Sequence, residues 1–132
     1  MKAVALTDKY MMGGAVEFYN AALSAGIKPI IGCELCLSEN GSLFHIILLA
    51  KDRKGYENLC RLVSSSNLDS NRSFPSVSMD FLKQAGSGLI GLSGCINGKV
   101  SRLLQKGLKK KALEAVREYN KIFGGDFYIE LQ

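Results

Sequence analysis

The chain has 132 residues, of which 47% are apolar and 22% are charged, a balance typical of a globular domain rather than a disordered segment. Its longest aliphatic run covers only residues 46–50, far short of the about 20 apolar residues that a membrane-spanning helix needs. These features exclude a disordered tail and a membrane protein, so we expect a cytoplasmic protein whose four cysteines are thiols.

The first third of the chain alternates short apolar runs with an amphipathic stretch, the pattern of βα units. We expect a strand over residues 3–6, a helix over residues 14–25 that Gly26 closes, and strands over residues 28–37 and 43–50. The helix is expected to turn four apolar positions toward the core: Val16, Tyr19, Ala22 and Leu23.

Asn40 and Gly41 separate the second and third predicted strands, and this dipeptide is a strong signal for a two-residue hairpin turn. Such a turn pairs Glu39 with Ser42 and fixes the register of the whole hairpin. A slip of one residue would move every side chain of a strand to the opposite face.

With that register, Cys36 lies opposite His45, and Glu34 shares their face, whereas Cys33 points to the other face and is expected to be buried. A carboxylate, an imidazole and a thiolate on one face can bind a transition metal such as zinc. The alternative is that the histidine and the cysteines are ordinary core residues, since a free cysteine behaves as a small hydrophobe. Because residues three apart on a strand face opposite sides, Cys33 and Cys36 are not expected to chelate one ion.

The rest of the chain continues the α/β pattern. Asp52 is expected to cap a helix with an apolar stripe at Tyr56, Leu59, Cys60 and Val63. Residues 64–77 are rich in Ser, Asn and Asp and are expected to form a surface loop. A helix from the cap Ser78 through Gln84 and a strand over residues 89–92 are expected next. Two helices follow, a short one lined by Val100, Leu103 and Leu104 and a longer one lined by Leu113, Val116, Ile122 and Phe123. The last expected element is a strand in which Phe127, Ile129 and Leu131 alternate.

The net charge of +5 is concentrated in the second half, where residues 67–132 carry +4. Six residues supply most of this excess: Lys99, Arg102, Lys106, Lys109, Lys110 and Lys111. They either face nucleic acid phosphates or form a solvated surface. No aromatic residues interleave with them, so a stacking platform for single strands is not indicated.

Eight strings spread along nearly the whole chain occur in a characteristic order: residues 5–8 (ALTD), 14–19 (GAVEFY), 26–34 (GIKPIIGCE), 44–45 (FH), 48–52 (LLAKD), 55–59 (GYENL), 88–95 (GLIGLSGC) and 127–132 (FYIELQ). Together they resemble the PHP (polymerase and histidinol phosphatase) domain, in the branch found at the N-terminus of the bacterial DNA polymerase III alpha subunit.

The resemblance implies an α/β fold, a partial and distorted (βα)7 barrel with about five strands, flanking helices and one β-hairpin, in which residues 1–132 form a single partial PHP domain. Complete members of the family gather His, Asp, Glu and Cys ligands around a cluster of metal ions. Four residues fall on matching positions and are the candidate ligands that the resemblance implies: Asp8, Glu34, His45 and Cys95. Asp8 and Cys95 also follow the ends of predicted strands, where α/β proteins often place reactive groups.

One departure from the family concerns Lys9, which stands where the family has a ligand histidine after the Thr-Asp pair. A protonated lysine cannot ligate a cation and repels it. The family's opening His-x-His strand and its later Asp-x-His are also absent from these residues. We therefore expect a vestigial site without a cofactor in this segment, the alternative being zinc or manganese if the site is intact.

The resemblance implies a parent protein that is a DNA-directed DNA polymerase, a nucleotidyltransferase of DNA replication. The segment would contain no catalytic residue of that reaction and would act as a scaffold, with the remainder of the alpha subunit, other replicase subunits and DNA as partners. Without the first strand the barrel cannot close, so we expect a longer chain or a partner to cover the open edge. Two alternatives are an autonomous metal-dependent phosphoesterase, with Asp8 as a bridging carboxylate, and a non-catalytic interaction module.

Overall fold

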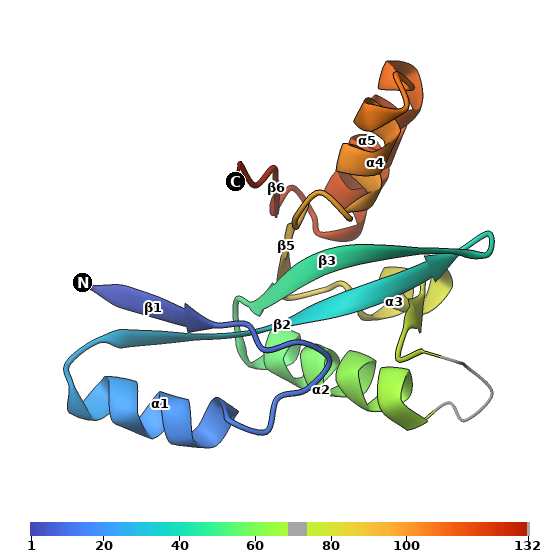
Figure 1. Ribbon diagram of the computed structural model, residues 1–132. Helices are drawn as coiled ribbons and strands as arrows, with labels where there is room; N and C mark the ends of the chain where they lie inside the picture. The colour runs from blue at the N-terminus through green and yellow to red at the C-terminus, as the bar shows by residue number, and fades with distance from the viewer. Residues whose placement is uncertain (69–73, 132) are drawn as a thin grey trace.

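The computed structural model describes residues 1–68 and 74–131, which form six strands and five helices (Figure 1). In chain order the elements are β1 (Ala3–Leu6), α1 (Ala15–Ser24), β2 (Lys28–Glu39), β3 (Ser42–Ala50), α2 (Arg53–Leu68), β4 (Val77–Ser78), α3 (Met79–Ala85), β5 (Leu89–Leu92), α4 (Lys99–Gln105), α5 (Lys109–Ile122) and β6 (Phe127–Tyr128). The strands form one curled mixed sheet that makes a half-barrel, which confirms the predicted fold class.

The long strand β2 organises the sheet, whose order is β1-β2-β3-β5-β6, with β4 also paired to β2. Its first four residues pair in parallel with β1, and the stretch from Gly32 to Glu39 pairs antiparallel with β3. Asn40 (φ 48°) and Gly41 (φ 74°) form the turn between them, in the left-handed conformation that a two-residue hairpin of this kind requires. The predicted register is confirmed, because Glu39 faces Ser42.

The main core lies on one face of the β2–β3 hairpin. Cys33, Leu35 and Leu37 alternate along β2 and are fully buried. Below this face α2 and α3 contribute Leu59 and Leu82, which are also fully buried. Because side chains alternate between the faces of a strand, the residues between these core positions point to the opposite face, where the candidate site lies.

Helix α1 differs from the prediction in the face that it buries. Ala15 and Ala22 are buried, whereas Val16 (67% exposed), Tyr19 (46%) and Leu23 (52%) are not. The helix therefore packs on β1 and β2 through its small side chains, and the expected inward stripe is wrong at three of its four positions.

The apolar faces predicted for α2 and α5 are confirmed at most of their positions, with one exposed residue on each. On α2 Leu59 is fully buried, Cys60 is half-buried and Val63 packs against the core, whereas Tyr56 is 39% exposed. On α5 Ala115 and Tyr119 are buried in addition to most of the four apolar positions that the sequence predicts. Of those four, Phe123 is buried, Val116 and Ile122 are partly buried, and Leu113 is exposed.

The loop predicted over residues 64–77 is partly wrong. Helix α2 continues to Leu68, and residues 77–78 form β4; residues 69–73 lie outside the described part of the chain. Ser66 Oγ and Asn67 Nδ2 both donate to the Val63 carbonyl oxygen, so these polar side chains are bonded within the helix. The predicted cap is confirmed, because Ser78 Oγ accepts a hydrogen bond from the Phe81 N–H.

The last strand is shorter than predicted, because β6 ends at Tyr128 and the next apolar side chains, Ile129 and Leu131, are 50% and 93% exposed. Within residues 1–68 and 74–131, every helix is too short or too polar to span a membrane.

Candidate metal site

Three of the four candidate ligands meet on the face of the sheet opposite the main core. Glu34 lies on β2, His45 on β3, and Cys95 in the loop that follows β5. One ligand atom from each of the three side chains lies within 4.8 Å of the others. Each residue is partly buried, so a small ion could reach the cluster from solvent.

Glu34 is the centre of the cluster. Its Oε1 atom lies 2.6 Å from His45 Nδ1, and both side chains are only partly exposed, at 16% and 21%. The same oxygen lies 3.9 Å from Lys9 Nζ, whose side chain is 64% exposed. Glu34 thus interacts with an imidazole on one side and with an exposed ammonium group on the other.

Backbone contacts hold His45 and the Cys95 loop together. The His45 N–H donates to the Asn97 carbonyl oxygen, and the Asn97 N–H contacts Cys95 Sγ at 3.5 Å. Gly94 provides the turn into this loop with φ +71°, a conformation that favours glycine. The end of β5 and the loop after it therefore place the Cys95 thiol beside the β2–β3 hairpin.

Asp8, the fourth candidate, lies outside this group. Its backbone carbonyl accepts hydrogen bonds from the Glu34 N–H and the Cys33 thiol, so the segment after β1 is fixed along β2. Its carboxylate points instead toward the start of α1, with Oδ2 3.7 Å from the position that a Cβ on Gly14 would occupy.

Tyr10 belongs to the surroundings of the site and was not predicted. It is one of two non-glycine residues with positive φ (63°) in the described chain, and its N–H donates to the Glu34 carbonyl oxygen. Burial raises the pKa of its phenol, as do the nearby Cys36, Glu34 and Cys95. Its left-handed backbone has no signature in the sequence, because tyrosine rarely adopts it.

The donor set fits one ion of the zinc type but not a multinuclear centre. Tetrahedral zinc with bonds of about 2.0–2.3 Å holds its ligand atoms about 3.3–3.7 Å apart, a spacing that this cluster reaches with small side-chain shifts. To bind such an ion, Glu34 and His45 would have to give up their 2.6 Å contact and both ligate the ion. A second ion would need Asp8, which points away.

The two cysteines of β2 behave as the alternation of a strand requires. Cys36 lies opposite His45, as predicted, and is 2% exposed, but the ligand group contains Cys95 in its place. Cys33 is fully buried in the main core, and burial raises the pKa of its thiol to about 11. The prediction that Cys33 is a core residue is confirmed.

The six basic residues of the second half divide into two groups. Lys99 Nζ lies 2.7 Å from Glu39 and 3.2 Å from Glu118, and its side chain is only 13% exposed. Arg102 donates to the Leu43 carbonyl oxygen and to Asn97 Oδ1. The other four are exposed at the turn between α4 and α5: Lys106, Lys109, Lys110 and Lys111.

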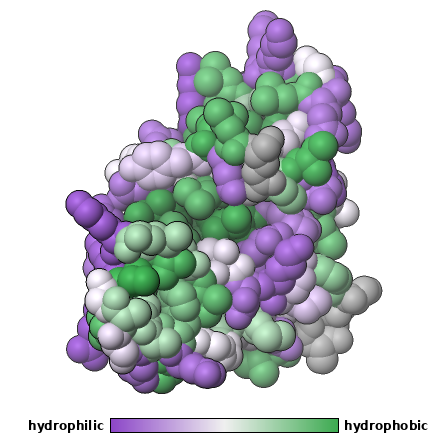
Figure 2. All heavy atoms as spheres, turned by 60° about the vertical axis from the view of Figure 1, so that its left-hand side comes forward, coloured by the Kyte–Doolittle hydropathy of each residue, from purple (hydrophilic) through white to green (hydrophobic). Residues whose placement is uncertain are grey.

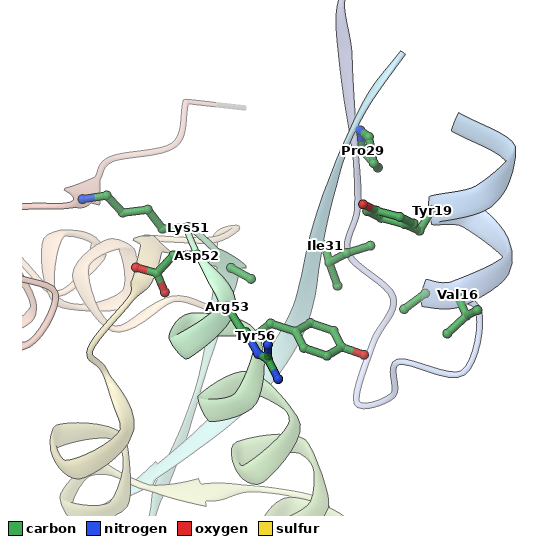
Figure 3. A pocket seen from close by; sticks show the side chains of 10 residues that line it. Val16, Tyr19, Pro29, Ile31, Lys51, Asp52, Arg53 and Tyr56 are labelled. Atoms are coloured by element: carbon green, nitrogen blue, oxygen red, sulfur yellow. The ribbon is translucent and has the colours of Figure 1, made fainter. Parts of the chain in front are cut away.

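An apolar groove lies away from the ligand cluster, between α1, β2 and the start of α2 (Figure 3). It measures about 470 Å³ and is mostly apolar, with Val16 and Tyr19 on one wall, Ile31 at its base and Tyr56 on the other wall. Figure 2, which brings the side of β1 and α1 forward, shows a broad apolar surface over this part of the molecule.

Comparison with known proteins gives a consistent result. Residues 1–132 match the PHP domain family. The chain is 38% identical over 143 residues to the DNA polymerase III subunit alpha of Borreliella burgdorferi, covering 100% of this chain and 12% of that protein. It is 39% identical over 136 residues to the subunit of the same name from Pseudomonas aeruginosa (100% and 12%), and 35% over 144 residues to that of Deinococcus radiodurans (98% and 11%). The chain thus spans about an eighth of the length of these relatives.

Proposed function

The chain belongs to the PHP domain family, and we propose that it is the PHP segment of a replicative DNA polymerase III alpha subunit, acting as a scaffold with a degenerate metal site. The whole protein would extend DNA by nucleotidyl transfer in the cytoplasm, with the carboxylates of that reaction outside these residues. Identity of 35–39% to alpha subunits along the entire chain supports this assignment.

The proposal of a degenerate site is carried by one observation, the position of the Lys9 ammonium 3.9 Å from the Glu34 carboxylate. A divalent cation bound by Glu34 and His45 would lie close to this positive charge, which opposes it. Lys9 thus supplies part of the charge that a metal ion would otherwise bring to Glu34, without any Lewis acid chemistry.

The scaffold role is supported by the apolar groove between α1 and α2. Val16 and Tyr19 are too exposed for core residues of an isolated domain, and together with Tyr56 they line a concave surface. Because the related proteins are about eight times longer, we assign this groove to the remainder of the same polypeptide. Packing there would fix the segment against the rest of the polymerase.

A second candidate function is a metal-dependent phosphoesterase, which the proximity of Glu34, His45 and Cys95 favours. A bound ion would polarise a phosphoryl oxygen and lower the pKa of its water. Glu34, His45 and Cys95 would hold that ion, and the Asn97 backbone would orient His45.

The two functions are separated by metal analysis of the purified protein together with hydrolysis of bis(p-nitrophenyl) phosphate in the presence of zinc or manganese. The scaffold proposal predicts less than one tightly bound ion per chain and hydrolysis no faster than that of a His45→Ala variant. Stoichiometric metal, with hydrolysis that His45→Ala abolishes, would establish the phosphoesterase instead.

A further inference from the structure

Helices α4 and α5 form a hairpin that projects from the sheet (Figure 1) and carries most of the charge of the molecule. Residues 99–122 contain eight Lys and Arg against two Glu, a net charge of +6, so the rest of the chain carries −1. The positive charge is therefore a property of this hairpin and not of the surface as a whole.

At the base of the hairpin the charge of Lys99 is compensated by carboxylates of the protein. Lys99 is held by Glu39 and Glu118, and Glu118 also pairs with Lys83 at 3.0 Å. Arg102 lies over the Phe44 ring and is hydrogen-bonded to backbone and amide oxygens. The side chains of Lys99 and Arg102 are thus engaged within the fold, Lys99 by carboxylates and Arg102 by neutral groups.

At the tip the charges are not compensated. The exposed lysines there are Lys106, Lys109, Lys110 and Lys111, and among the described residues none of them makes an ion pair. The nearest acidic residue on α5 is the exposed Glu114, a single carboxylate beside four ammonium groups.

The turn at the tip is well ordered by backbone bonds. Gly107 (φ +70°) donates to the Leu104 carbonyl oxygen, and the Leu108 N–H donates to that of Leu103. The lysines at residues 109–111 then occupy the first turn of α5, where positive charges oppose the helix dipole. Lysines at this position do not stabilise the helix. Their presence there is explained if they bind an anionic partner.

We propose that this tip binds the phosphate backbone of double-stranded DNA without reading its sequence. Lysines act as point charges toward phosphates, whereas recognition of unstacked bases needs aromatic platforms, which residues 99–118 lack. The choice of DNA over other polyanions rests on the proposed function as part of a polymerase.

The test measures binding of a fluorescein-labelled duplex of about 24 base pairs by fluorescence anisotropy from about 50 to about 200 mM NaCl. The full chain is compared with the triple variant Lys109→Gln, Lys110→Gln, Lys111→Gln. We expect the slope of log affinity against log salt to become shallower by about 2–3, since each phosphate contact contributes about 0.9. The matched control replaces Lys2, Lys28 and Lys54, three exposed lysines outside the hairpin, by Gln and has the same net charge.

An equal decrease in the salt slope of the triple variant and of its control would overturn the proposal, because the effect would then be one of overall charge. Absence of salt-dependent binding by the full chain would overturn it as well. If the full chain binds poly-L-glutamate more tightly than the duplex, and the triple variant loses this binding, the partner of the tip is an acidic protein and the proposal is wrong. Circular dichroism verifies that each variant is folded. Since neither the metal content nor the assay with His45→Ala involves these lysines, failure here leaves the proposed function standing.

Discussion

Cys33 shows how a single side chain couples the core to the segment after β1, which carries Lys9. Its thiol is fully buried and donates to the Asp8 carbonyl oxygen at 3.2 Å. Burial disfavours the thiolate and raises its pKa from 9.0 to about 11. Above pH 9 the unfolded chain therefore loses a proton that the folded chain retains, which favours unfolding.

We predict that the free energy of unfolding falls as the pH rises from about 9 to about 11, by up to about 1.4 kcal/mol per pH unit for this thiol. Urea unfolding followed by circular dichroism measures it. Cys33→Ala should be less stable at neutral pH but show a shallower decline, whereas Cys60→Ala should retain the steep one. Equal slopes in both variants would contradict this explanation.

The residues of the candidate site differ in how far the sequence predicts them. Glu34 and His45 follow from the hairpin register, which the Asn40–Gly41 turn fixes. Cys95 was expected from its place after a strand, but its approach to His45 depends on the Asn97 backbone, a contact between distant parts of the chain. No local pattern encodes such a contact.

Among the elements, the end of β2 is tied to the α4–α5 hairpin by one buried ammonium group. Lys99 pairs with Glu39 on β2 and with Glu118 on α5, and it lies 5.8 Å from the centre of the Tyr119 ring. Burial acts to raise the pKa of Glu118, but the bonds from Lys83 and Lys99 outweigh it and lower that pKa. The contribution of this carboxylate to stability is thus present above its ordinary value of 4.5 and is lost as the pH falls below it.

Lys99→Met should destabilise the fold by about 2 kcal/mol or more at pH 7, because it leaves two partly buried carboxylates without their shared partner. Lys106→Met removes an exposed ammonium group from the same hairpin and should change stability by less than about 0.5 kcal/mol. The difference between the two variants should shrink as the pH falls below about 4.5, which chemical unfolding at several pH values measures. A difference that is absent at pH 7 would show that the ion pairs are not stabilising.

Strands were predicted more accurately than helix faces, for a physical reason. Period-two alternation and the hairpin turn leave one register for β2 and β3, whereas a helix can bury either small or large apolar side chains. In α1 the buried Ala15 and Ala22 face the sheet, whereas the side chain of Tyr19 is 46% exposed. The sequence alone does not reveal which face of a helix has a neighbour, and we propose that the neighbour of Tyr19 belongs to another part of a longer polypeptide.

For the whole molecule, the apolar groove between α1 and α2 is the surface on which the proposed scaffold role depends. Three of its lining residues, Val16, Tyr19 and Tyr56, are exposed. A concave apolar surface of this kind binds hydrophobic probes when nothing covers it.

We predict that the native chain enhances the fluorescence of 1-anilinonaphthalene-8-sulfonate and that Tyr19→Gln reduces the enhancement by about half. Leu23→Gln is the matched control, since Leu23 is similarly exposed on α1 but does not line the groove. Both variants should unfold at the temperature of the unaltered chain. An equal reduction in both would mean that the dye does not use the groove.

The proposed degenerate metal site is tested most directly by the zinc affinity of the chain, measured by titration against a chromophoric chelator. Lys9→Met removes the ammonium group beside Glu34, and Lys54→Met removes an exposed ammonium group on α2. We predict that Lys9→Met binds zinc about tenfold more tightly or better, about 1.4 kcal/mol, while Lys54→Met matches the unaltered chain. If the unaltered chain instead binds one zinc ion as tightly as Lys9→Met does, the site is intact and the claim is wrong.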